Sequence, residues 1–203
     1  MGVERTVYLA GPDVFLRNAL EMGARKKELC ARYGFKGRYP FDNEVPADVP
    51  DPDRVIYRAN VRMMREVDFG IFNLTPFRGP SADAGTVFEL GLMIGLGKPV
   101  FGYTNAAADL MIRVKTAVAL SFDPKTSFWR DPAGMMVEDV GNADNLMIDA
   151  ALAEQGHPIV RTATRARDRF RDLTGFETCL SRAAEFYASA EGLPAGAEGS
   201  RGA

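Results

Sequence analysis

Residues 69–103, FGIFNLTPFRGPSADAGTVFELGLMIGLGKPVFGY, contain two short apolar runs separated by a loop and a long apolar segment. Short apolar runs bounded by turn residues predict buried strands, here over residues 69–74 and 98–103. Residues 84–97 predict a helix that is apolar or small on every face, and such a helix is normally buried. A strand, a helix and a second strand in this order favour a parallel sheet with helices packed on it.

Glu89 is the only charged residue in the predicted buried helix. A lone carboxylate in such a place loses its water and needs a partner or a purpose. The preceding loop supplies a second carboxylate, Asp83. The pair is compatible with attack of a carboxylate on a sugar carbon, a reaction in two displacements that keeps the anomeric configuration. Helix capping is an equally good interpretation of the local pattern, because Thr86 and Glu89 have capping-box spacing and Asp83 could be an N-cap.

The alternation extends over most of the chain. Further strands are predicted over residues 6–10, 36–39 and 159–162, and further helices over residues 15–33, 54–67, 106–116, 145–152 and 174–188. Asp53 is a predicted N-cap. Residues 40–53 are rich in proline and predict a loop, whereas residues 121–141 show no sustained period and predict an irregular subunit contact or a cover over a base. In parallel sheets of this kind, ligands bind at the carboxyl ends of the strands.

Composition limits the class of protein. The 203 residues are 46% hydrophobic with a formal net charge of −2, which predicts one domain over residues 1–189 and a small, polar, mobile tail over residues 190–203. Without a basic excess, nucleic acid is not an expected partner. No apolar run has transmembrane length and no signal-peptide pattern is present, so we expect a cytoplasmic protein with no membrane partner.

Cysteine and histidine do not predict a metal site, a disulfide or a histidine-based catalytic pair. Cys30 and Cys179 lie far apart without CxxC spacing, and Cys30 falls in a helical pattern typical of the core. His157 is the only histidine, and no nucleophile motif lies near it. Neither GxGxxG nor GxxxxGK[ST] follows any predicted strand, which disfavours familiar dinucleotide and triphosphate sites.

Five segments together resemble the nucleoside 2-deoxyribosyltransferase family. They are residues 8–12 (YLAGP), 60–68 (NVRMMREVD), 73–91 (NLTPFRGPSADAGTVFELG), 98–100 (KPV) and 144–148 (DNLMI). The D-x-x-G-T-x-x-E-L-G pattern is the most specific piece, and the order and spacing extend over about three quarters of the chain. The resemblance implies a flavodoxin-like three-layer α/β sandwich with a central parallel sheet of about five strands.

The resemblance also implies roles for individual residues. Glu89 matches the nucleophile of a covalent deoxyribosyl–enzyme intermediate, Tyr8 the tyrosine that orients it, and Asp83 the acid that binds the sugar hydroxyls. Asn145 and Met147 match residues that complete a neighbouring subunit's site, which implies a homo-oligomer built from dimers. The base and sugar pocket is expected to involve Gly11, Pro12, Asp13, Phe15, Phe41, Asp42, Asn43, Asn60 and Gly85. The substrates would be 2′-deoxynucleosides and free nucleobases, with no metal or organic cofactor.

Asn60 departs from several relatives, which carry an aspartate thought to aid proton transfer to the base. An amide can hydrogen-bond a base but cannot act as a general acid. Proton delivery would then come from Asp42, Asp13 or water. This leaves the choice between base transfer and hydrolysis open.

Two alternatives accompany the transferase. The first is a nucleoside 5′-monophosphate N-glycoside hydrolase, for which Ser81, Thr86, Arg17 or Arg78 would have to bind the phosphate. The second is a non-catalytic nucleotide-sensing module. The joint presence of Tyr8 and two carboxylates argues against a sensor, since a binder needs no nucleophile.

Overall fold

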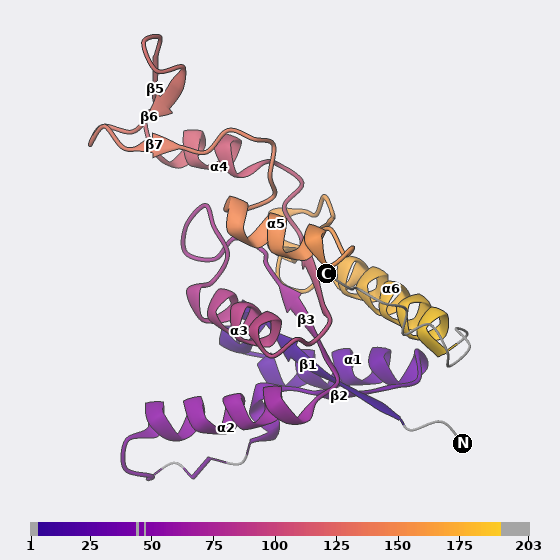
Figure 1. Cartoon of the computed structure of the whole chain (residues 1–203). Helices are drawn as coiled ribbons and strands as arrows, with labels where there is room; N and C mark the ends of the chain where they lie inside the picture. The colour runs from indigo at the N-terminus through magenta and orange to yellow at the C-terminus, as the bar shows by residue number, and fades with distance from the viewer. Residues whose placement is uncertain (1–3, 44, 47, 192–203) are drawn as a thin grey trace, which may run out of the picture.

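Strands and helices alternate along the chain, as the apolar runs predict. The computed structural model describes residues 4–43, 45–46 and 48–191 (Figure 1). With η for 3₁₀ helices, the elements are β1 (Arg5–Ala10), η1 (Pro12–Phe15), α1 (Ala19–Arg32), β2 (Phe35–Arg38), η2 (Pro40–Asp42), α2 (Pro52–Glu66), β3 (Phe69–Asn73), α3 (Ala84–Gly95), β4 (Val100–Thr104), α4 (Leu110–Ala117), β5 (Ser121–Asp123), β6 (Phe128–Arg130), β7 (Met136–Val137), α5 (Leu146–Glu154), β8 (Val160–Arg161), η3 (Ala166–Asp168) and α6 (Thr174–Glu191).

The central sheet has five strands in the order β2-β1-β3-β4-β8, and every neighbouring pair is parallel. Counted along the chain this is the order 2-1-3-4-5, which is the flavodoxin-like arrangement. The order reverses at β1 and β3, and a doubly wound sheet binds ligands at the carboxyl ends of the strands near such a reversal. The predicted fold class is therefore confirmed.

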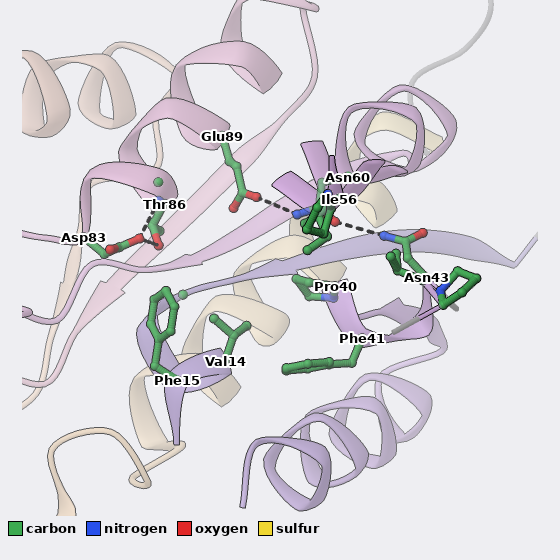
Figure 2. Close-up of a pocket in the computed structure, with 15 residues that line it drawn as sticks. Val14, Phe15, Pro40, Phe41, Asn43, Ile56, Asn60, Asp83, Thr86 and Glu89 are labelled. Carbon is green, nitrogen blue, oxygen red and sulfur yellow. Dashed lines mark hydrogen bonds between the residues drawn. The ribbon is translucent and has the colours of Figure 1, made fainter. Parts of the chain in front are cut away.

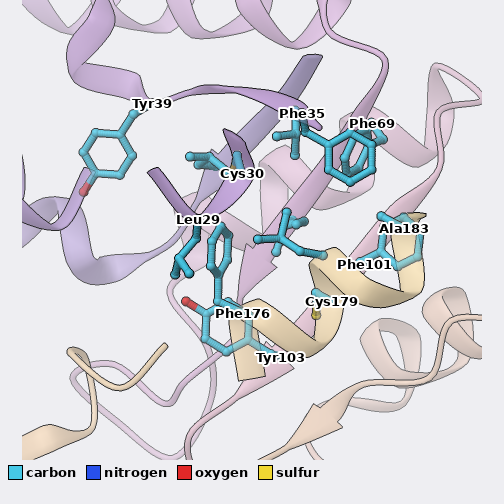
Figure 3. Packing of buried hydrophobic residues seen from close by; sticks show 14 residues of the cluster. Leu29, Cys30, Phe35, Tyr39, Phe69, Phe101, Tyr103, Phe176, Cys179 and Ala183 are labelled. Atoms are coloured by element: carbon cyan, nitrogen blue, oxygen red, sulfur yellow. The ribbon is translucent and has the colours of Figure 1, made fainter. Parts of the chain in front are cut away.

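Helices cover both faces of the sheet, and two separate hydrophobic clusters result. α1 and α6 pack on one face with Val7 and Leu9 of β1 (Figure 3). α2, α3 and α5 pack on the other face with Tyr8 and Ala10 of the same strand. Because successive side chains of a strand point to opposite faces, Tyr8 is directed toward α2 and α3.

α1 begins later than predicted. The periodicity predicts a helix from Phe15, but the chain forms the short helix η1, then an extended Leu16, and α1 starts at Ala19. Gly11 explains the tight exit from β1: its φ is 152°, and a Cβ there would lie 2.5 Å from the Cβ of Asn73. Only glycine accommodates both the dihedral angle and the close approach.

The N-cap predicted for α2 is wrong by two residues. Asp51, not Asp53, occupies the N-cap position, with a left-handed φ of 52°. Pro52 follows as the first helical residue, and its ring matches the φ of a helix start. Asp53 lies within the first turn, where its carboxylate interacts favourably with the helix dipole.

The prediction that α3 is buried on every face is wrong for the single chain. Thr86, Leu90 and Met93 form the buried stripe, whereas the Phe88 side chain on the opposite side is 54% exposed. A helix laid on one face of a sheet buries only the stripe that faces the strands. The apolar side chains on the outer face of α3 therefore do not contribute to the hydrophobic core of this chain.

Residues 121–141 are more regular than predicted. β5, β6 and β7 form a three-stranded antiparallel sheet that projects away from the central sheet beside α4 (Figure 1). Its strands have three, three and two residues, too few for a visible alternation of apolar and polar positions. The side chains of Phe122 in β5 and Met136 in β7 are half exposed.

α6 extends to Glu191, and residues 192–203, most of the predicted tail, lie outside the described residues. Within the described ranges, no helix is both long and apolar enough to cross a membrane. Cys30 and Cys179 are buried free thiols, as the helical pattern around Cys30 predicts for that residue. The ring of His157 stacks on Phe101, with ring centroids 4.2 Å apart, which gives it a packing role.

Candidate active site

A cavity of about 600 Å³ opens beyond the carboxyl ends of β1 and β2, beside the first turns of α3 (Figure 2). Its wall is mostly apolar and consists of Val14, Phe15, Pro40, Phe41, Val45, Pro46, Pro52 and Ile56. The other lining residues are Gly11, Asn43, Asn60, Asp83, Gly85, Thr86 and Glu89. An apolar wall with a few converging polar groups is typical of small-molecule sites.

Eight residues predicted at the site line this cavity: Gly11, Phe15, Phe41, Asn43, Asn60, Asp83, Gly85 and Glu89. They come from η1, η2, α2 and α3, so segments up to 78 residues apart meet here. The parallel topology explains their meeting, because it places the segments that follow β1, β2 and β3 at one edge of the sheet.

Glu89 is held by a tyrosine from beneath the cavity. The Tyr8 hydroxyl, fully buried in β1, donates a hydrogen bond of 2.7 Å to Oε1 of Glu89. Burial raises the pKa of Tyr8 far above its ordinary value, and the neighbouring Glu89 carboxylate raises this pKa further. Tyr8 therefore keeps its proton at any physiological pH and acts only as a donor to the carboxylate.

Burial raises the pKa of Glu89 to about 7. The hydrogen bond from Tyr8 opposes this rise, the nearby Asp83 carboxylate adds to it, and the Asn60 amide opposes it. No cation is among these influences. Glu89 therefore gains its charge near neutral pH, as expected of a carboxylate that must be ionised to react.

Asp83 both caps α3 and lines the cavity. Its Oδ2 accepts hydrogen bonds from the backbone N of Thr86 at 2.9 Å and from the Thr86 hydroxyl at 3.1 Å. The capping interpretation of Asp83 is thus confirmed. The capping box of Thr86 with Glu89 is wrong, because Thr86 lies inside α3 and Glu89 is engaged by Tyr8.

Asn60 of α2 faces Glu89 across the cavity. Its Nδ2 lies 3.5 Å from Oε1 of Glu89, and its Oδ1 accepts a hydrogen bond of 2.9 Å from Nδ2 of Asn43 (Figure 2). Both amides are half-buried. The two side chains form a line of amides that ends on the carboxylate.

Pro12 and Asp13 do not line the cavity, although the sequence predicts them there. Both are buried, and Asp13 is fully enclosed by polar partners. Its Oδ2 pairs with Lys26 Nζ at 2.7 Å and accepts from the Tyr39 hydroxyl at 3.2 Å, while its Oδ1 accepts from Asn73. The predicted contact of Asp13 with a substrate conflicts with this arrangement, because its oxygens already have protein partners.

Asp42 also lies outside the lining of the cavity. Its Oδ1 pairs with Lys27 Nζ at 2.7 Å, and its Oδ2 accepts from the backbone N of Tyr39 at 2.9 Å. These contacts hold the turn that follows β2, on which Phe41 and Asn43 are presented. The carboxylate stabilises the turn that carries Phe41 and Asn43 and is not part of the lining of the cavity.

Asn145 and Met147 lie apart from the cavity of their own chain. Asn145 is the N-cap of α5: its Oδ1 accepts from the backbone N of Met147, and its Nδ2 donates to Glu138 at 2.7 Å. Met147 is 71% exposed. Their predicted place in a neighbouring subunit's site stays a prediction.

The apolar wall is what sequence reasoning missed. Val14, Pro40, Val45, Pro46, Pro52 and Ile56 all line the cavity without having been predicted there. Three of them, Pro40, Val45 and Pro46, belong to the proline-rich segment between β2 and α2, where apolar residues in a loop were the available signal. Such residues have no helix or strand face to cover, so a ligand is a natural partner.

Known proteins resemble this chain in sequence. A sequence model described as nucleoside 2-deoxyribosyltransferase matches residues 7–147. An uncharacterised protein of Schizosaccharomyces pombe is 33% identical over 164 residues, which cover 74% of this chain and 78% of that protein.

Solved structures are similar over nearly the whole chain. A 2-desoxiribosyltransferase from Leishmania mexicana matches with a TM-score of 0.61 and 25% identity, covering 89% of this chain and 97% of that one. A conserved protein from Enterococcus faecalis V583 matches with a TM-score of 0.53 and 17% identity, covering 89% of this chain and 99% of that one. The second likeness shows the fold alone.

Proposed function

This chain belongs to the nucleoside 2-deoxyribosyltransferase family, and on that premise we propose that it exchanges the base of 2′-deoxynucleosides through a covalent deoxyribosyl–Glu89 intermediate. The observation that carries the proposal is the 2.7 Å hydrogen bond from Tyr8 to Glu89 in a mostly apolar cavity. A carboxylate that has a raised pKa, a fixed orientation and no cation is suited to attack.

In the first step, a carboxylate oxygen of Glu89 forms a bond to C1′ of the sugar as the C1′–N bond to the base breaks. The electron pair of that bond leaves with the base, which takes a proton from the medium. In the second step, a nitrogen of an incoming base attacks C1′ and gives up its proton to the medium, the ester bond breaks, and the electron pair returns to Glu89. Two inversions at C1′ retain the anomeric configuration.

The transition state supports the choice of a 2′-deoxy sugar. The C1′–N bond breaks through an oxocarbenium-like state, which an electron-withdrawing 2′-hydroxyl would disfavour. In this proposal the ionised Glu89 stabilises the developing positive charge, and the second acid, Asp83, which lines the same cavity, binds the sugar hydroxyls. The apolar wall contributed by Phe15, Phe41 and Ile56 suits the flat face of a nucleobase.

The structure favours a nucleoside over a nucleoside 5′-monophosphate. The hydroxyls of Ser81 and Thr86, which would have to bind a phosphate, donate to the carboxylates of Asp144 and Asp83. Arg78 lies over aromatic rings, with its guanidinium 4.6 Å from the centroid of Phe77. A phosphate at this helix start would meet two carboxylates, so the monophosphate hydrolase is the weaker hypothesis.

We also propose that residues 1–189 act as one domain within a cytoplasmic homo-oligomer. The exposed Met147 and the apolar outer face of α3 support a second copy as the partner that covers them. The buried free thiols Cys30 and Cys179 suit a reducing compartment. Sedimentation at micromolar concentration tests the assembly, and loss of activity in Asn145→Ala tests whether the sites are shared.

The test of function is base exchange. Purified protein is mixed with 2′-deoxyinosine and adenine, and the products are separated by chromatography. Deoxyadenosine that forms with wild-type protein, and fails to form with Glu89→Ala, is the expected result. Hypoxanthine release without deoxyadenosine would replace transfer by hydrolysis, and the absence of any reaction would favour a sensor.

A further inference from the structure

Three side chains from three elements form a line that ends on the nucleophile. Asn43 follows η2, Asn60 lies on α2 and Glu89 lies on α3. Asn43 Nδ2 donates to Asn60 Oδ1 at 2.9 Å, and Asn60 Nδ2 lies 3.5 Å from Glu89 Oε1 (Figure 2). In the described part of the chain Asn43 makes no hydrogen bond to Glu89, so any effect of Asn43 on the nucleophile must pass through Asn60.

The donor from Asn43 decides which end of the Asn60 amide faces the carboxylate. An asparagine amide has one accepting oxygen and one donating NH₂ group, on opposite sides of the same carbon. When the oxygen accepts from Asn43, the NH₂ group points the other way, toward Glu89. A rotated amide would present its oxygen to the Glu89 carboxylate, and two acceptors repel each other.

Tyr8 and Asn60 both donate to the same oxygen, Oε1 of Glu89. Within the described residues, Oε2 of Glu89 has no hydrogen bond from the protein. The oxygen without protein donors is the one with its lone pairs available for C1′ of the sugar. The two donors therefore distinguish a held oxygen from an attacking oxygen.

We propose that Asn43 is a positioning residue for the nucleophile: by fixing the Asn60 amide, it keeps Oε1 of Glu89 hydrogen-bonded and leaves Oε2 free to attack the sugar. This inference rests on the proposed function and goes beyond it, since it assigns the roles of the two carboxylate oxygens and gives Asn43 an effect on the nucleophile that passes through Asn60.

The surroundings of Glu89 explain why one neutral donor matters. The titratable groups that face it are Tyr8 from β1 and Asp83 at the start of its own helix, and α2 contributes the neutral Asn60. Burial and Asp83 both disfavour the ionised form, and only Tyr8 and Asn60 favour it. Loss of one of two favourable donors changes the balance measurably.

The test is a double-mutant cycle on Asn43 and Asn60 with neutral substitutions only. The side-chain ¹³C signal of Glu89, assigned by its loss in Glu89→Gln, is titrated in wild type, Asn43→Ala, Asn60→Ala and the double variant. We expect Asn43→Ala to raise the pKa of Glu89, by at most about one pH unit, and to lower kcat about three- to tenfold with little change in KM. In the Asn60→Ala background the same substitution should change neither quantity.

Two further variants make the result specific. Asn43→Gln keeps an amide donor, so its Glu89 titration and kcat should return toward wild type. Gln155→Ala is the matched control. The amide oxygen of Gln155 accepts from the backbone N of Val100, the first residue of β4, at the amino ends of the strands and away from the cavity. It should leave both the titration and kcat unchanged. Thermal unfolding of each variant checks that the fold is intact.

An equal effect of Asn43→Ala in both backgrounds, or no effect in wild type, overturns the proposal. The titration needs no turnover, so the outcome is independent of the exchange assay. If the Glu89 titrations of the four proteins behave as expected but no base exchange occurs, the orientation of Glu89 stands and the proposed function fails. If exchange occurs without coupling between Asn43 and Asn60, the function stands and the positioning role fails.

Discussion

Asp13 and Glu89 are two carboxylates withdrawn from water near the end of β1, and their partners differ in charge. Asp13 pairs with Lys26 at 2.7 Å and accepts further hydrogen bonds from Tyr39 and Asn73. Among the described residues, the donors to Glu89 are the neutral Tyr8 and Asn60. A carboxylate with its counter-charge is part of the architecture, whereas one without it keeps the capacity to react.

The two acids also interact with helices on opposite faces of the central sheet. Asp13 reaches toward α1, where Lys26 is 1% exposed and lies 5.5 Å from the ring centroid of Phe176. Glu89 opens onto the cavity. The enclosed pair supports the loop that carries Gly11 and Phe15, and the open acid uses the cavity that this loop helps to shape.

The largest expected effect separates the two acids by activity. Glu89→Ala should lower base exchange about 10⁴-fold or more, because it removes the nucleophile itself. Chromatographic product analysis measures the rate, and circular dichroism checks the fold. Retention of wild-type rates in this variant would remove Glu89 from the mechanism.

The next effect separates them by stability. Lys26→Met should lower the free energy of unfolding by about 3–5 kcal/mol, because it leaves Asp13 buried without its counter-charge. Urea denaturation measures the loss. The double variant Lys26→Met with Asp13→Asn should recover much of it, since no charge then stays buried.

The neighbouring lysine supplies the control for that measurement. Lys27 pairs with Asp42 in a partly exposed position, with side-chain exposures of 40% and 26%. Lys27→Met should cost at most about 1 kcal/mol, as exposed ion pairs do. Equal losses in Lys26→Met and Lys27→Met would contradict the structural role given to Asp13.

A smaller effect concerns the donor beneath Glu89. Tyr8→Phe should lower kcat about ten- to hundredfold, the loss expected for one hydrogen bond to a charged group. Because that bond lowers the pKa of Glu89, its removal should shift the acidic limb of the pH–rate profile to higher pH. A profile that does not move would assign Tyr8 to packing alone.

The smallest effect is on stability as a function of pH. The pKa of Glu89 rises from 4.5 to about 7 on folding, so between these values the folded chain holds a proton that the unfolded chain has lost. This contribution therefore lowers stability as pH rises through that window. At pH 8, the free energy of unfolding of Glu89→Gln should exceed that of wild type by roughly 1–2 kcal/mol, so the variant should unfold at a higher urea concentration. No difference between pH 5 and pH 8 would mean that the pKa of Glu89 is ordinary.

The alternation of strands and helices was predictable because local apolar runs and turn residues determine it. Glu89 stood out by its charge in an apolar segment. The burial of the helix around it, α3, was overestimated, because periodicity states which residues are apolar but not whether a second layer covers them. The small sheet β5–β7 escaped prediction because strands of two or three residues contain no period.

The site was predictable in part for the same reason. Asp83 and Glu89 are close in sequence, and helix geometry places them near each other. The partners of Asp13 were not predictable: Lys26, Tyr39 and Asn73 lie 13, 26 and 60 residues away. A pattern of residue types does not predict which buried acid forms an ion pair with a cation.

The order of apolar and polar residues by itself determined a parallel sheet with helices packed on it, and a lone acid, Glu89, in the apolar helix α3. Tertiary packing alone decided that Lys26 neutralises Asp13, and that the partners of Glu89 in the described part of the chain are the neutral Tyr8 and Asn60. The physical reason is that the energy of a buried charge depends on atoms within a few ångströms of it, and those atoms are brought together only when distant segments pack.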